Sequence, residues 1–396
     1  MRFLLSGDWH LGKIINQTSM LDEQMHALKQ IKAIIAAEHV DCLMVTGDIY
    51  DRAIPPKEAI EVFDSFVSEL VGDGVQIVLI AGNHDSQERL AFGRTLLQRG
   101  GLHIADKFRG HLKPLTLEDA HGPLHIYLIP FAPFQTIRTT LDDSDITTYH
   151  RAYEKILATI PLDPKARNLL MTHAFVRAQN AAVESSDSEK TLAVGGIEIV
   201  DAALFAPFDY VALGHLHKPQ TVGRDTCRYT GSLCKYSFSE ASHQKSVIRL
   251  DLGAKGHIEQ TLHPLKPHRD FVVLKDTFAR LLSDTKRIEK HKNDYVKVVV
   301  TDHDEISEPV PRLRQVFPHI MEFTYAEAVD TQMAETMMSA VLAERLQGGS
   351  SQDFEGVFLD LFEDFADKTA DITLTDAMRR ILTDALDAVM KAGRNV

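Results

Sequence analysis

The first eighty or so residues alternate between short apolar runs and segments with apolar side chains at helical spacing. The runs at residues 3–6, 41–46 and 75–80 predict buried strands. Between them, two helices are expected, one up to about Glu38 and one opened by Pro55 and Pro56. Ser19 and Asp22 have the spacing of a capping box for the first helix. The helical stripes consist of Met25, Leu28, Ile31 and Ile35, then Ala59, Val62, Phe63, Phe66, Val67 and Leu70.

This order of strand, helix, strand, helix, strand predicts a parallel sheet with right-handed crossovers. In such sheets ligands bind beyond the carboxyl ends of the strands. Each of the three predicted strands ends there in polar residues: Gly7-Asp8-Trp9-His10, Gly47-Asp48 and Gly82-Asn83-His84-Asp85. One such end could be an ordinary polar turn, but three at one edge indicate a site. We expect Asp8 and His10, two residues apart in an extended segment, to point to the same side.

The middle of the chain is predicted to be mainly β-structure. The strand at residues 168–172 ends in His173, and the strand at 209–213 leads into His215 and His217, again with same-side spacing. Other strands are expected at 124–130, 227–230, 247–252 and 258–262. The polar stretch 177–196 is predicted to be an exposed loop, and residues 231–239 a loop close to the site.

Composition shifts divide the chain into three parts. Residues 1–266 form the predicted main domain, 267–329 a small α+β unit, and 330–396 a helical segment. The helical segment contains an amphipathic helix whose apolar face could pack on the protein itself or dock onto a partner. Residues 350–396 have a net charge of −5, which disfavours contact with DNA phosphates. The apolar face consists of Phe354, Val357, Phe358, Leu361, Phe362 and Phe365.

Composition places the chain among globular proteins of the cytoplasm. Of 396 residues, 44% are hydrophobic and 25% charged, and no apolar run is long enough for a membrane span. The three cysteines form no C-x-x-C pair, which fits reduced thiols. The net charge of −13 argues against nonspecific binding of nucleic acid over the whole surface. It does not exclude a local phosphate site, because bound divalent cations would reverse the sign of a carboxylate-rich pocket.

The strand-end residues together form a set of metal-ligand types. Oxygen and nitrogen ligands without thiolates suit manganese, iron or zinc. Seven ligands are too many for one ion and fit two, with Asp48 as the bridge because it follows the central strand. Two ions about 3.5–4 Å apart can bind a hydroxide and polarise a phosphoryl group. His84 is placed to give a proton to the leaving oxygen, whereas Asp85 is left with a turn-capping role. The ligands are Asp8, His10, Asp48, Asn83, His173, His215 and His217.

The ordered motifs resemble those of the calcineurin-like metallophosphoesterases. Within that superfamily, the chain is similar to the SbcD nuclease subunits of DNA repair. The resemblance implies an α/β fold, a four-layer metallophosphoesterase β-sandwich flanked by helices, with a capping domain and C-terminal helices. The motifs that resemble the superfamily are Asp8-x-His10, Gly47-Asp48-x-x-Asp51, Gly82-Asn83-His84-Asp85, His173 and Gly214-His215-x-His217. Those that resemble the SbcD subunits are Gly7-Asp8-Trp9-His10-Leu11-Gly12 and Gly231-Ser232 before Lys235-Tyr236.

The same resemblance implies roles for individual residues. One manganese ion would be held by Asp8, His10, Asp48 and His217, and the other by Asp48, Asn83, His173 and His215. His84 would protonate the leaving group, oriented by Asp51. Arg52, Lys235 and Tyr236 would contact the substrate.

Three functional hypotheses follow. The first is a manganese-dependent DNA nuclease, exonuclease on double strands and endonuclease on single strands or hairpins, working with an SbcC-type coiled-coil ATPase. The second is a metallophosphatase or cyclic-nucleotide phosphodiesterase with the same metal site, although such an enzyme needs neither the extra domain nor the tail. The third is an inactive scaffold, which the complete ligand set disfavours. The family also suggests a homodimer through helices near the start of the chain, and the C-terminal helices as the ATPase contact.

Overall fold

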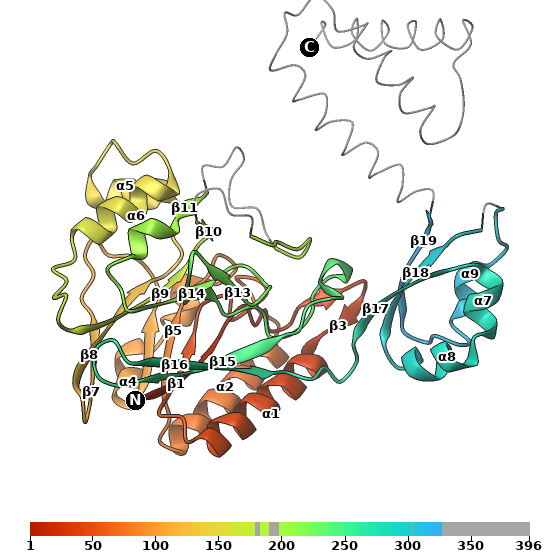
Figure 1. The fold of residues 1–396 in the computed structure, drawn as a ribbon, viewed down its shortest axis with the longest axis horizontal. Helices are drawn as coiled ribbons and strands as arrows, with labels where there is room; N and C mark the ends of the chain where they lie inside the picture. Colours follow the sequence, from red (N-terminus) through yellow and green to blue (C-terminus); the bar gives the residue numbers. More distant parts are fainter. Residues whose placement is uncertain (179–182, 190–197, 303, 327–396) are drawn as a thin grey trace, which may run out of the picture. The chain divides into compact units, whose positions relative to one another are not determined.

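The computed structural model describes residues 1–178, 183–189, 198–302 and 304–326. Two six-stranded sheets form the larger part (Figure 1). In order across the first sheet, the strands are β16 (Ile258–Pro264), β15 (Ser246–Leu252), β1 (Arg2–Ser6), β4 (Cys42–Val45), β5 (Gln76–Ile80) and β6 (Leu102–Ala105). Across the second they are β13 (Gln220–Val222), β14 (Arg224–Tyr229), β12 (Tyr210–Gly214), β9 (Arg167–His173), β8 (Gly122–Ile129) and β7 (Leu115–Asp119).

The pairing confirms the predicted parallel sheet. β1 and β4 pair in parallel, as do β4 and β5, and β4 lies between the other two. In the second sheet, β9 pairs in parallel with both β8 and β12. The carboxyl ends of β1, β4 and β5 are therefore at one edge of the first sheet, and those of β9 and β12 at one edge of the second.

Alternate residues of the central strands pack in different layers. Phe3, Met44 and Val78 belong to a core that also contains Leu169 and Ala212 of the second sheet. The neighbouring positions Leu4, Leu43 and Ile77 pack with α1 (Leu21–Glu38) and α2 (Lys57–Gly72). On the other side, α5 (Phe134–Leu141) and α6 (Tyr149–Ala158) share a core with β9 and β12. The four layers are thus helices, sheet, sheet and helices, which confirms the predicted fold class (Figure 1).

Two local predictions were wrong. The capping box at Ser19 and Asp22 does not form: the residue before α1 is Met20, and no side chain caps the helix. The middle of the chain is less purely β than predicted, because α5 and α6 lie between β8 and β9. Shorter elements of this part are β2 (Ile14–Ile15), β3 (Thr18–Ser19), α3 (Gln87–Leu90), α4 (Arg94–Arg99), β10 (Val176–Arg177) and β11 (Val200–Asp201).

After Pro267 the chain forms a three-stranded sheet with short helices. The strands β17 (Phe271–Asp276), β18 (Tyr295–Val300) and β19 (Ile320–Tyr325) are neighbours in that order. The helices are α7 (Phe278–Ser283), α8 (Thr285–His291) and α9 (Pro309–Leu313). Buried Glu23 of α1 accepts hydrogen bonds from the backbone N–H groups of His268 and Arg269. A carboxylate on α1 therefore holds the segment that leads into the three-stranded sheet. The predicted helices of residues 330–396 lie outside the described residues.

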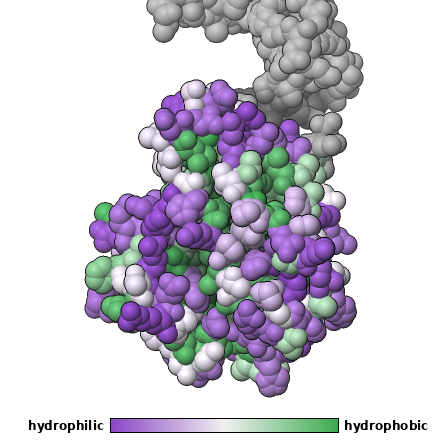
Figure 2. All heavy atoms as spheres, turned by 90° about the vertical axis from the view of Figure 1, so that its left-hand side faces the viewer, coloured by the Kyte–Doolittle hydropathy of each residue, from purple (hydrophilic) through white to green (hydrophobic). Residues whose placement is uncertain are grey.

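The surface is mixed in character. The face in Figure 2 is mostly hydrophilic, with separate hydrophobic areas between the polar side chains. Within the described ranges, no helix combines the length and apolar composition needed to cross a membrane.

Candidate active site

Four of the seven predicted ligands have a left-handed backbone. The φ angles are 48° at Asp8, 46° at His10, 49° at Asp48 and 105° at His215. L-residues adopt this region rarely and at an energetic cost, and such residues cluster at functional sites. The segment from Asp8 to His10 is therefore not extended, and the predicted reason for their shared orientation was wrong, although both side chains do reach the site.

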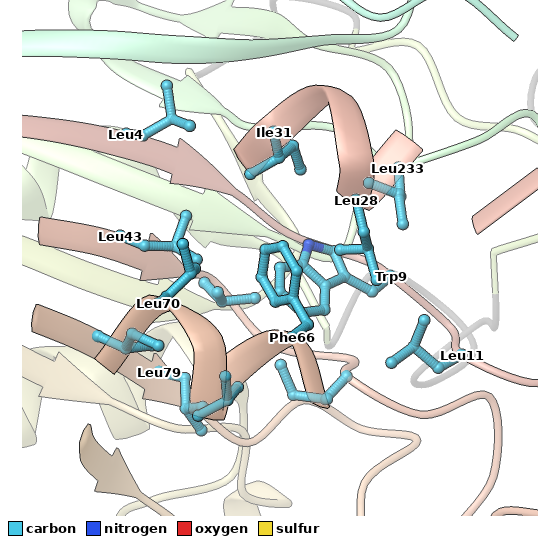
Figure 3. Close-up of a cluster of buried hydrophobic side chains, with 14 of the residues drawn as sticks. Leu4, Trp9, Leu11, Leu28, Ile31, Leu43, Phe66, Leu70, Leu79 and Leu233 are labelled. Atoms are coloured by element: carbon cyan, nitrogen blue, oxygen red, sulfur yellow. The ribbon is translucent and has the colours of Figure 1, made fainter. Parts of the chain in front are cut away.

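Trp9 fixes this strained segment to the core. Its ring is fully buried between α1 and α2, where it contacts Phe66 edge to face at 5.5 Å between ring centroids (Figure 3). Its indole N–H donates to Ser6 Oγ at 2.9 Å. Because Trp9 points into the core, Asp8 and His10 on either side of it are held at the sheet edge.

Two glycines allow the strand ends to approach one another. A Cβ atom at Gly82 would lie 2.1 Å from Asp48 Oδ1, and one at Gly214 would lie 2.1 Å from the Thr46 carbonyl oxygen. Side chains cannot be accommodated at such distances. The glycines of the Gly-Asn-His-Asp and Gly-His-x-His motifs therefore bring the loops of both sheets around Asp48.

Five of the seven predicted ligands form two groups of donor atoms. In one, His10 Nε2 lies 3.1 Å from His217 Nε2. In the other, Asn83 Oδ1 lies 2.9 Å from His173 Nε2 and 3.3 Å from His215 Nδ1.

Asp48 Oδ2 lies between the two groups. It is 3.7 Å from His10 Nε2 and 3.5 Å from His173 Nε2. Asp8 lies next to the second group, because its Oδ1 is 3.9 Å from His173 Nδ1. One carboxylate oxygen is thus within reach of both clusters.

The donor set fits divalent metal ions. Asp8 Oδ2 is buried and has no hydrogen-bond partner, which is costly for a carboxylate oxygen unless it binds a cation. Burial and the neighbouring Asp48 carboxylate raise the pKa of Asp8 well above its ordinary value. Burial also lowers the pKa values of His10, His173 and His215, which favours the neutral form of each ring, the form that binds a metal ion. A divalent cation would stabilise the ionised carboxylates and accept the lone pairs of these rings.

His84 is held from two sides. Its backbone N–H donates to Asp48 Oδ1 at 2.8 Å, and its ring Nδ1 lies 2.7 Å from the backbone carbonyl oxygen of Asp51. A carbonyl oxygen only accepts, so Nδ1 carries a proton and Nε2 is the nitrogen left for chemistry. The prediction that Asp51 orients His84 therefore needs a correction, because the contact uses the main chain. The Asp51 carboxylate instead pairs with Lys13 at 2.8 Å.

The three predicted substrate contacts differ in their surroundings. The side chain of Arg52 is 58% exposed and its guanidinium lies 3.8 Å from the Asp51 carboxylate. Lys235 Nζ donates to the Ala241 carbonyl oxygen and pairs with Asp270 at 2.7 Å. Tyr236 is buried, and its hydroxyl donates to the carbonyl oxygen of Trp9. Lys235 and Tyr236 thus both have partners within the protein, and their contact with substrate stays a prediction.

Asp85 caps the loops around the site, as predicted. Its carboxylate accepts backbone N–H groups from Ile49 at 3.1 Å, Tyr50 at 3.0 Å and Gly82 at 2.9 Å. Burial and the nearby Asp48 raise its pKa to about 7. The residue ties the loop after β4 to the loop after β5.

A second buried carboxylate, Glu240, was not identified from the sequence. It lies 3.2 Å from His217 Nδ1 and pairs with Lys245 at 2.6 Å. Residues 183–189 were expected to be exposed, yet Ser188 and Glu189 both bond to His217. No motif surrounds these residues, so only the folded chain brings them to the site.

Comparison with known proteins identifies the family of this chain. Residues 1–219 match the family model of the calcineurin-like phosphoesterases, and residues 267–369 match a model described as the type 5 capsule protein repressor C-terminal domain. The chain is 32% identical over 324 residues to the SbcD subunit of the SbcCD nuclease of Staphylococcus epidermidis, covering 81% of this chain and 84% of that protein.

The solved structures that match this chain include a dimetal phosphatase from Danio rerio and the phosphoesterase Yfce from E. coli. The first is 12% identical, covers 67% of this chain and 96% of that one, and has a TM-score of 0.42. The second is 14% identical, covers 66% and 98%, and has a TM-score of 0.29. The family assignment rests on the sequence matches: this chain belongs to the SbcD-type nuclease subunits of the calcineurin-like phosphoesterase family.

Proposed function

We propose that this chain hydrolyses DNA phosphodiesters as the nuclease subunit of an SbcCD-like complex, in repair, recombination and replication. Its expected activities are exonuclease on double strands and endonuclease on single strands and hairpins. The observation that carries the proposal is the placement of Asp48 Oδ2 within 3.7 Å of imidazole nitrogens from both donor groups. Family membership selects a nuclease over the alternative phosphatase.

The proposed ligands divide between two manganese ions. Asp8, His10, Asp48 and His217 would hold one, and Asp48, Asn83, His173 and His215 would hold the other. Two such ions, when bound, supply Lewis acidity to the phosphoryl oxygens and lower the pKa of the attacking water. Manganese suits this mixture of carboxylate, amide and imidazole donors.

His84 is the proposed general acid. As the oxygen of a hydroxide, formed when the water has lost a proton to solvent, bonds to phosphorus, the bond from phosphorus to the ester oxygen breaks. That oxygen takes a proton from Nε2 of the His84 imidazolium, while Nδ1–H stays bonded to the Asp51 carbonyl oxygen at 2.7 Å. The exposed guanidinium of Arg52, 3.8 Å from the Asp51 carboxylate, is proposed to contact a DNA phosphate.

Substrate class can be tested with the purified chain after metal removal. With added Mn²⁺, we expect cleavage of a hairpin or nicked duplex at a rate far above that of a phosphomonoester. Hydrolysis of the monoester alone would contradict the nuclease proposal and favour the phosphatase alternative.

The proposed partner is an SbcC-type ATPase, supported by the relative's name as a subunit of SbcCD. We propose that residues 330–396 carry this contact, within a domain division of 1–266, 267–329 and 330–396. Deletion of residues 350–396 is expected to weaken co-purification with that ATPase. Unchanged co-purification would refute the docking proposal.

We also propose a homodimer and a cytoplasmic location. An apolar surface lies on and around α4, where Phe92 is 86% and Leu96 72% exposed, with Leu97 and Ile60 nearby. Exposed apolar side chains in such a group are typical of protein interfaces. The free cysteines Cys42, Cys227 and Cys234 support a reducing compartment.

A further inference from the structure

His217 is held by its neighbours at each of its polar groups except ring Nε2. Its backbone N–H donates to Glu189 Oε1 at 2.6 Å, and its carbonyl oxygen accepts from Lys245 Nζ at 2.7 Å. Ring Nδ1 lies 2.7 Å from Ser188 Oγ and 3.2 Å from Glu240 Oε1. The remaining Nε2 faces His10 Nε2 at 3.1 Å.

The protonation of the ring follows from these partners. The carboxylate of Glu240 only accepts, and Ser188 uses its hydroxyl proton to donate to it. An unprotonated Nδ1 would therefore place a lone pair against the serine and carboxylate oxygens. The stable arrangement has the proton on Nδ1, which leaves the lone pair of Nε2 directed at the site.

Glu240 remains charged because of Lys245. Both side chains are buried, 0% and 5% exposed, and their N–O distance is 2.6 Å. The same ammonium also bonds to the His217 carbonyl oxygen.

The carboxylate contacts at Nδ1 of His10 and His173 are longer, 3.8 Å to Asp51 Oδ1 and 3.9 Å to Asp8 Oδ1. His173 Nδ1 lies against the Thr46 carbonyl oxygen at 2.9 Å, and His10 Nδ1 has no hydrogen-bond partner. We propose that Glu240, neutralised by Lys245, is the positioning residue for His217. It fixes the ring and its tautomer, and it raises the affinity of one of the two metal positions selectively. This inference rests on the proposed dimetal site.

The test is calorimetric titration of the metal-free full chain with Mn²⁺. The variant Glu240→Gln/Lys245→Met removes both charges at similar volume, so no unpaired charge is left buried. We expect one Mn²⁺ to bind roughly 10–100-fold more weakly, as for other partners of ligand histidines, and the second to keep its wild-type affinity. Asp119→Asn is the matched control, because it removes a carboxylate paired with Arg167 at the amino end of β9, away from the site.

The outcomes separate the inference from the proposed function. Two ions bound by the wild type and equally tightly by the double variant would overturn the role of Glu240. No binding of Mn²⁺ by the wild type would overturn the dimetal site itself. If the double variant does not fold, ¹⁵N chemical shifts of His217 in the metal-free wild type decide: an Nδ1–H tautomer is expected, and an Nε2–H tautomer would contradict the proposal.

Discussion

His84 differs from the ligand histidines in what holds it. Its ring Nδ1 is fixed by the backbone of Asp51, and its hydrogen bond to the proposed ligand Asp48 comes from the backbone N–H, which a substitution of the side chain keeps. His84→Gln should therefore leave the bound metal unchanged and slow DNA cleavage about 100–10,000-fold, the usual contribution of a general acid. Metal analysis and a cleavage assay on the same preparation measure both. Loss of metal together with activity would show that His84 is a ligand.

For single residues, the sequence predicted which residue types form the site better than it predicted their backbone conformations. The order of Asp8, His10, Asp48, Asn83, His173, His215 and His217 along the chain was sufficient to propose a ligand set. It could not show that Asp8 and His10 are left-handed, since that depends on Trp9 packing against Phe66. Nor could it find Glu240, which is 23 residues away from His217 along the chain and contacts it in the folded protein.

Asp85 connects two elements of the first sheet. It accepts three backbone N–H groups from the loops after β4 and β5. Asp85→Ala leaves these donors unsatisfied and should lower the free energy of unfolding by roughly 2–4 kcal/mol. Asp85→Asn keeps one carbonyl oxygen as an acceptor and should lose less. Urea unfolding checks both variants, and a change below about 0.5 kcal/mol for Asp85→Ala would contradict the role, since ordinary surface changes are of that size.

Asp119 joins β7 to the start of β9. Its carboxylate accepts from Arg167, from the amino group of Met1 and from the backbone of His121. The hydrogen bond from Arg167 holds the pKa of Asp119 below its ordinary value. A depressed folded-state pKa stabilises the protein above the unfolded value of about 3.9, and that stability is lost as the pH falls toward the folded value.

Asp119→Asn should accordingly lower the free energy of unfolding by about 1–2 kcal/mol at pH 7. The difference from the wild type should shrink below about pH 4, where the unfolded carboxyl becomes protonated. Urea unfolding across this pH range measures it. A difference that is the same at pH 7 and pH 3 would contradict the assignment.

The elements that were predicted share a clear local pattern. β1, β4 and β5 are continuous buried runs, and α2 has a wide apolar stripe, so periodicity alone identified them. The helix α6 was missed because it is ten residues long and its buried face mixes Tyr149, Ala152, Tyr153 and Ile156. Its position is determined by packing on the second sheet, which no local pattern records.

The whole molecule is acidic and has an apolar surface at α4. If that surface is the contact between two copies, Phe92→Glu and Leu96→Glu should convert a dimer to a monomer without loss of folding, because both residues are exposed. Leu262→Glu on β16, also exposed, is the control and should remain a dimer. Sedimentation velocity distinguishes the two states. A monomeric wild type would refute the proposed dimer.

The central claim is that one carboxylate, Asp48, joins two metal positions. The most direct measurement is the number of Mn²⁺ ions bound per chain, with Asp48→Asn compared with the wild type. We predict two ions for the wild type and weakened binding of both in the variant, because Asp48 Oδ2 lies beside both donor groups. A single ion in the wild type, or loss of only one ion in Asp48→Asn, would contradict the account.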